Sequence, residues 1–342
     1  MKTDIFTDAL LFWTFGKDFV REYLPKLRRA SWDTVRSYRS ALNSFISYLE
    51  CQKTVGRKNI SFSMFSKDLI EEYLKWMMEE QCLSPETAKA RLSAIRSFME
   101  YASGREKFLT ETYLSILKIK LPKPQPRPIE YFEQEQMEKM LEAPDIRTPV
   151  GRRNQMMLIL LYDTGMRAAE LLGLTIGSIH LEHNPPYVRI KGKGNSYRDV
   201  PLLLDGTVAH LNGYVKEFHP HSSKGDYLFY ATTHNIRHKL SYDTLDNLVK
   251  ACCQKCREKG FSMPDNAHAH MFRKSRAMHL YKEGRSLPHI QQLLGHKSIS
   301  TTTGFYAFAT LDMLSKALGN GNVEKYIWEE DEEFKAFIYS LE

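Results

Sequence analysis

Several charged side chains in the second half of the chain interrupt sequence that is otherwise apolar. Arg167 follows a glycine that is expected to end a buried helix, and Glu170 comes three residues later, so the two can face the same side. Lys193 lies between two glycines at the expected tip of a β-hairpin. His270 and Arg273 are three residues apart, which places them on one face of a helix.

A further motif combines a histidine with a tyrosine, because His296 is followed ten residues later by Tyr306. Two arginines, one lysine and two histidines suit phosphoryl transfer without a metal ion, since a guanidinium can bind two phosphate oxygens and stabilise charge that builds on them. Such a reaction also needs a nucleophile and a general acid, for which Tyr306 and Lys193 are the candidates. The tyrosine hydroxyl has an ordinary pKa of about 10, so cationic surroundings would have to favour its ionised form.

In this order the motifs resemble those of the tyrosine site-specific recombinases of the phage integrase family. That family has an arginine in a T-G-x-R-x-x-E box, a lysine in a G-K-G hairpin, an H-x-x-R box, an L-G-H box and a tyrosine. The matching segments here are Thr164–Glu170, Gly192–Asn195, His270–Arg273, Leu294–His296 and Tyr306. Each motif is unspecific alone, but five in order are specific.

The resemblance implies a role for each of these residues. The side chains that would surround the scissile phosphate are Arg167, Arg273, His270 and His296. Lys193 would protonate the departing 5′ oxygen, Tyr306 would become linked to the 3′ phosphate, and Glu170 would pair with a basic neighbour. The family uses no metal and no other cofactor. Family members commonly place the tyrosine nine residues after the last histidine, and the flexible Gly304 could accommodate the extra residue here.

A proline-rich segment, Leu121–Pro128, has four prolines in eight residues and predicts an extended linker. It divides the chain into a helical domain at 1–120, a catalytic domain at 129–321 and a C-terminal tail at 322–342. By the resemblance, the first domain is the core-binding domain, which holds the recombination site.

The first domain is predicted to be a small helical bundle. Ser31 and Ser84 are expected to cap helices with apolar residues at steps of three and four, and 65–80 gives another helix. Basic residues interleaved along two of these helices are candidates for phosphate contacts: Arg36, Arg39, Lys89, Arg91 and Arg96. The alternative is an ordinary solvated helix face.

The second domain is expected to be mostly helical with one small antiparallel sheet. Helices are predicted at 134–141 and 152–162 and again from Tyr242 onwards, and strands at 187–190 and 196–202. The predicted fold class is therefore mainly α, with a helical core-binding domain and a mostly helical catalytic domain.

Charge and composition favour a DNA partner and argue against a membrane protein. The chain has 342 residues and a net charge of +7, yet its last 22 residues carry seven acidic and two basic side chains. The rest is therefore strongly basic, which suits double-stranded DNA. The longest apolar run, Met156–Tyr162, is far shorter than the roughly 20 residues that span a bilayer. A cytoplasmic protein with reduced cysteines is expected.

Other functions fit parts of the pattern. Cys253 and Cys256, with His268 and His270, have the residue types of a zinc site, but their spacing fits neither a zinc finger nor a zinc ribbon. A DNA-binding architectural protein without catalysis would not need the full set of polar residues. A type IB topoisomerase would use a similar cluster without exchanging DNA partners.

The tail at 322–342 combines apolar residues at helical spacing with an acidic block, Glu329–Glu333. Because this block would repel DNA, the tail is expected to cover a protein surface. In related recombinases a C-terminal segment docks on a neighbouring subunit, which implies a tetramer on DNA. The alternative is that the tail folds back on its own catalytic domain.

Overall fold

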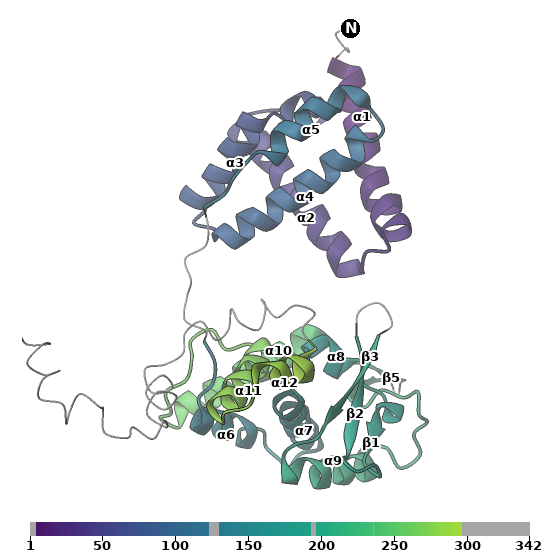
Figure 1. Ribbon diagram of the computed structural model, residues 1–342, viewed down its shortest axis with the longest axis vertical. Coiled ribbons are helices and arrows are strands. Elements are labelled where there is room, and N and C mark those ends of the chain that lie inside the picture. Colours follow the sequence, from purple (N-terminus) through teal and green to yellow (C-terminus); the bar gives the residue numbers. More distant parts are fainter. Residues whose placement is uncertain (1–4, 123–129, 193–195, 235, 296–342) are drawn as a thin grey trace, which may run out of the picture. The chain divides into compact units, whose positions relative to one another are not determined.

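The computed structural model describes residues 5–122, 130–192, 196–234 and 236–295. The chain divides into two compact units, 1–126 and 127–342 (Figure 1). Most of the expected linker and all of the C-terminal tail lie outside the described residues. No helix within the described ranges is long and apolar enough to cross a membrane.

The first unit is a bundle of helices. The α-helices are α1 (Ile5–Asp18), α2 (Trp32–Gln52), α3 (Lys67–Glu79), α4 (Pro85–Ser103) and α5 (Thr110–Leu117). A π-helix, η1 (Phe19–Leu27), continues directly from α1, and the short 3₁₀ helices are η2 (Arg57–Asn59), η3 (Phe62–Met64) and η4 (Lys107–Leu109).

Serine side chains start three of these helices. The hydroxyls of Ser31, Ser66 and Ser84 accept hydrogen bonds from backbone N–H groups three residues later, at 3.3, 3.2 and 3.2 Å. The predicted caps at Ser31 and Ser84 are thus confirmed. The buried faces of α2 and α4 meet in an aromatic core in which Phe45 and Phe98 are fully buried.

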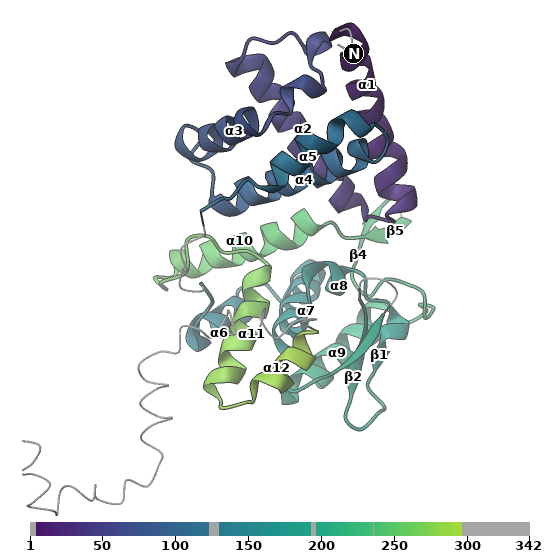
Figure 2. The same cartoon turned by 45° about the horizontal axis from the view of Figure 1, so that its top comes forward.

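The second unit is built around α7 (Pro149–Thr164), which contacts α6 (Gln134–Glu142), α8 (Ala168–Leu172), α9 (Asp205–Phe218) and α11 (His270–Lys282). The other helices among the described residues of this unit are η5 (Ile176–Ser178), α10 (Tyr242–Glu258) and α12 (Leu287–Leu294). Figure 2 shows α7 among its neighbouring helices. Its fully buried residues include Met157, Leu158 and Leu160, as its apolar sequence predicts.

The described part of this unit contains two small antiparallel sheets. The first has the order β1 (Ile179–His180), β2 (Tyr187–Lys191), β3 (Tyr197–Pro201), and buried Val188 and Val200 lie opposite each other on β2 and β3. The second pairs β4 (Tyr230–Thr233) with β5 (Ile236–Lys239) and was not expected from the sequence. The predicted fold class, mostly helical with a small antiparallel sheet, is confirmed.

Candidate active site

A sharp turn at the end of α7 places Arg167. The helix ends at Gly165, whose φ of 59° is left-handed, and Arg167 is the N-cap of α8. A Cβ atom at Gly165 would lie 2.7 Å from Cδ2 of Leu294. Glycine is therefore required both by the backbone conformation and by the close approach of α12.

Glu170 accepts hydrogen bonds from two arginines, Arg167 and Arg198. Its Oε1 accepts hydrogen bonds from Arg167 Nη1 at 3.0 Å and from Arg198 Nη1 at 2.9 Å. Its Oε2 accepts from Arg198 Nη2 and from the backbone N–H of Arg167, both at 2.8 Å. Burial alone would raise the pKa of Glu170, but the hydrogen bonds from Arg198 and Arg167 and their charges lower it to about 2. The carboxylate is therefore ionised, and it pairs with a basic neighbour as expected.

Arg273 is almost completely buried on α11, with 3% of its surface exposed. It donates hydrogen bonds to the carbonyl oxygens of Gly165 at 2.8 Å and Leu294 at 2.7 Å. Burial, together with the charge of Arg167, lowers the pKa of Arg273 to about 9, so it stays charged at neutral pH. One guanidinium thus joins the turn that carries Arg167 to the turn that precedes His296.

His270 begins α11, one turn before Arg273. The residue is exposed at the surface, yet the protein around its ring and then the charges of Arg273 and Lys274 lower its pKa to about 4. Arg167 contributes to the same repulsion. The imidazole is therefore neutral at pH 7 and can accept a proton.

The structure thus brings Arg167, Glu170, His270 and Arg273 together. Lys193, His296 and Tyr306 lie outside the described residues. The last pair of the β2–β3 ladder is Lys191 with Tyr197.

Arg198 is the member of the cluster that the motifs missed. It lies on β3 two residues before buried Val200, and alternation along a strand puts both on the inner face of the sheet. The sequence signal that could have identified Arg198 is a charged residue at an inward-facing position of a strand.

Both units match known domains. Residues 130–311 match the phage integrase family, and residues 18–106 match the N-terminal SAM-like domain of phage integrases. The chain belongs to the phage integrase family. The prediction from the five motifs that the protein is a tyrosine recombinase is confirmed.

Curated relatives of this recombinase cover most of its length. It is 31% identical over 300 residues to tyrosine recombinase XerC of Chlamydia caviae, covering 82% of this chain and 90% of the relative. It is 30% identical over 315 residues to tyrosine recombinase XerC of Bacillus subtilis, covering 87% and 94%.

Solved structures of recombinases share the fold. The XerH site-specific recombinase in a post-cleavage complex with palindromic difH substrate has a TM-score of 0.65 and 25% identity, covering 91% of this chain and 84% of that one. A λ integrase tetramer bound to a Holliday junction has a TM-score of 0.62 at 17% identity, covering 86% and 76%. The second likeness concerns the fold alone.

The basic residues expected to contact DNA differ in their surroundings in the recombinase. Arg36, Arg39 and Lys89 are exposed. Arg91 donates to the carbonyl oxygen of Ser40 at 2.8 Å. The Arg96 guanidinium donates to the carbonyl oxygens of Ile116, Leu117 and Ile119 at the end of α5, so its hydrogen bonds serve the helix terminus.

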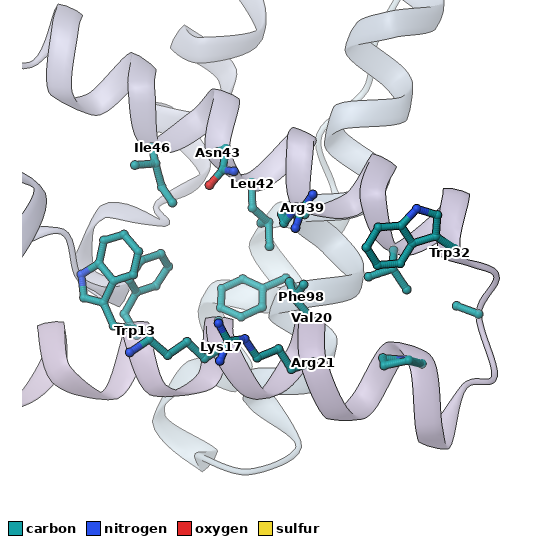
Figure 3. A pocket seen from close by; sticks show the side chains of 15 residues that line it. Trp13, Lys17, Val20, Arg21, Trp32, Arg39, Leu42, Asn43, Ile46 and Phe98 are labelled. Carbon is teal, nitrogen blue, oxygen red and sulfur yellow. The ribbon is translucent and has the colours of Figure 1, made fainter. Parts of the chain in front are cut away.

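A groove between α1–η1 and α2 is lined by two basic residues, Lys17 and Arg21, that the sequence analysis did not name as candidates. Figure 3 shows Lys17 and Arg21 on one wall and Arg39 on the other, with Trp32 at one end. The groove has a volume of 630 Å³, and Trp32 is 70% exposed. The guanidinium of Arg39 lies 6.0 Å from the centre of the Trp32 ring.

The cysteines considered for zinc are buried in the face of α10. The thiol of Cys253 donates to the backbone carbonyl oxygen of Pro264, and the thiol of Cys256 donates to the backbone carbonyl oxygen of Lys139. Burial raises the pKa of both thiols. In the part of the chain that the structure describes, no three His, Cys, Asp or Glu side chains are grouped as a metal site.

Proposed function

We propose that this recombinase cuts and rejoins double-stranded DNA at specific sites through a 3′-phosphotyrosyl intermediate. The observation that carries the proposal is the convergence of Arg167, His270 and Arg273 from two segments that are more than 100 residues apart. Arg273 is fixed by two backbone carbonyls before any substrate binds, so the cationic site is preorganised.

Each side chain then has a defined task. Arg167 and Arg273 bind the non-bridging oxygens of the scissile phosphate and stabilise the charge of the transition state. Neutral His270 can accept a hydrogen bond or a proton from the attacking hydroxyl. Tyr306 is the proposed nucleophile, Lys193 the proposed general acid, and His296 a further phosphate ligand.

The covalent link conserves the energy of the phosphodiester bond, so a strand can be rejoined to a new partner without ATP. The arginines and Lys193 would supply the positive charge that many nucleases take from Mg²⁺, so cleavage should proceed in excess EDTA. The tail at 322–342 would join the copies of a DNA-bound tetramer. Since the substrate is cellular DNA, we place the activity in the cytoplasm. Its role would be the integration, excision, inversion, resolution or transposition of a DNA element.

The test is covalent trapping on a nicked duplex taken from the DNA that flanks the gene. Wild type should form an adduct that survives denaturant, with EDTA present, and Tyr306→Phe should bind the duplex without forming one. Tyr227→Phe, which removes another partly exposed hydroxyl, is the control. A covalent adduct formed by Tyr306→Phe would show that Tyr306 is not the nucleophile. A second assay measures strand exchange between paired sites, which a recombinase performs and a topoisomerase does not.

A further inference from the structure

Arg198 occupies a central place in the cationic cluster, where it binds Glu170. Its two terminal nitrogens lie 2.9 and 2.8 Å from the two oxygens of Glu170, which is the parallel two-bond geometry typical of an arginine with a carboxylate. The side chains of Arg198 and Glu170 are 19% and 9% exposed, whereas that of Arg167 is 47% exposed. Glu170 is therefore the most buried of the three side chains, and Arg198 is far less exposed than Arg167.

Arg198 also supports a second turn. Gly295 ends α12 with a left-handed φ of 65°. A Cβ atom there would lie 3.0 Å from Cδ and Nε of Arg198 and 3.1 Å from its Cζ. The guanidinium thus packs against the backbone of the residue directly before His296. Its Nε is buried and has no hydrogen-bond partner among the residues that the structure describes.

The charges of Arg167, Glu170 and Arg198 explain why two arginines bind one carboxylate. A carboxylate 3.0 Å from Arg167 would neutralise the cation that has to bind phosphate. Arg198 supplies a second positive charge to the same carboxylate. Glu170 can therefore orient Arg167 while the cluster around Arg167 and Arg273 remains cationic.

We propose that Arg198 is a positioning residue for the recombination reaction, which balances the charge of Glu170 and so keeps Arg167 available to the scissile phosphate, while packing against the turn before His296. The inference rests on the proposed function. It assigns Arg198 no contact with DNA.

The inference predicts a specific rescue. In Arg198→Met, Arg167 remains the ion-pair partner of the Glu170 carboxylate among the residues that the structure describes, and the carboxylate neutralises it. Adduct formation should therefore slow by about 10- to 100-fold, the effect of losing an outer partner of a metal ligand. Binding to a single site should change less than about threefold, because most affinity comes from other phosphate contacts. Adding Glu170→Gln removes the unbalanced negative charge, so the double variant should be faster than R198M alone.

A matched control lies on the same hairpin. Arg189 and Asp199 form an equivalent two-bond pair across β2 and β3, with both distances 2.8 Å, but their side chains are 46% and 44% exposed. Arg189→Met removes the same type of pair on the solvent face. Its rate of adduct formation should stay within about twofold of wild type, because exposed pairs contribute little.

The experiment measures single-turnover adduct formation on the nicked duplex at saturating protein, alongside single-site affinity. R198M with a wild-type rate would overturn the inference, as would a double variant no faster than R198M. Weaker binding in R198M that Glu170→Gln does not restore would indicate a direct DNA contact instead. If R198M does not fold, Arg198→Gln with and without Glu170→Gln answers the same question, since glutamine removes the positive charge but keeps hydrogen-bond donors. A wild type that forms no adduct would instead reject the proposed function.

Discussion

Asp163 and Arg276 form an ion pair sealed from solvent beneath the candidate site. Nη2 of Arg276 lies 3.5 Å from Oδ1 of Asp163, and the two side chains are 4% and 0% exposed. The Arg276 Nε also donates to the backbone carbonyl oxygen of Asp163 at 3.2 Å. Asp163 in turn accepts from the backbone N–H groups of Leu203 and Leu204, so the pair ties α7 and α11 to the segment after β3.

Replacing Arg276 with methionine should destabilise the second unit severely. Asp163 would be left as a buried charge without its cation, and breaking such a pair costs about 3–5 kcal/mol. Urea unfolding followed by circular dichroism measures the loss. Arg147→Met is the control, because that side chain is 87% exposed and its pair with Asp145 should contribute little to stability. Equal stabilities of the two variants would contradict the expectation.

Gly165 should not tolerate alanine. The substitution would force a side chain into a left-handed conformation and place its Cβ 2.7 Å from Leu294, which together cost about 2–4 kcal/mol. Gly213, inside α9 with nothing within 4 Å of a Cβ, is the matched control. Gly213→Ala should stabilise the protein by about 0.5–1 kcal/mol. Thermal melting of both variants decides, and a stable, active Gly165→Ala would contradict the described turn.

His270 should titrate well below the usual histidine range in the free protein. Its lowered pKa of about 4 means that the folded protein binds this proton less readily than the unfolded chain. The group's contribution to stability is therefore complete above the unfolded pKa of about 6.5 and is lost as the pH falls towards 4. NMR of labelled histidine rings, assigned with His270→Gln, measures the midpoint. A phosphate bound beside the ring should raise it, and a free-protein midpoint above 6.5 would be inconsistent with the site.

Removing residues 322–342 should separate binding from synapsis. The truncated protein should still bind a single site but fail to pair sites and exchange strands, because the tail is proposed to join subunits. Gel-shift and strand-exchange assays with one and two sites measure the two steps. Tighter single-site binding with normal recombination would favour the alternative in which the tail shields its own catalytic domain.

Local features of the fold could be predicted from the sequence because they depend on neighbouring residues. Ser31 and Ser84 cap helices through bonds to residues three positions away. In contrast, β5 is exposed along its whole length and shows no alternation that would reveal a strand. The π-helix η1 contains Pro25 and departs from the usual helical period.

The candidate site was predictable by residue type but not by pairing. The motifs identified Arg167, Glu170, His270 and Arg273, whereas the partner of Glu170 lies 28 residues further along on another element. The same limit applies to Arg96, whose acceptors are 20 to 23 residues away. Contacts of this kind depend on how the elements pack, which no short motif encodes.

The burial of the cysteines determines where the protein can be labelled chemically. Cys51 and Cys82 are exposed, and both belong to the helical first unit. Cys252, Cys253 and Cys256 are buried, and burial raises the pKa of Cys252 to about 12, so its reactive thiolate is rare at neutral pH. A maleimide fluorophore should therefore attach to the helical unit alone and report its binding to DNA, with all five native cysteines kept in place.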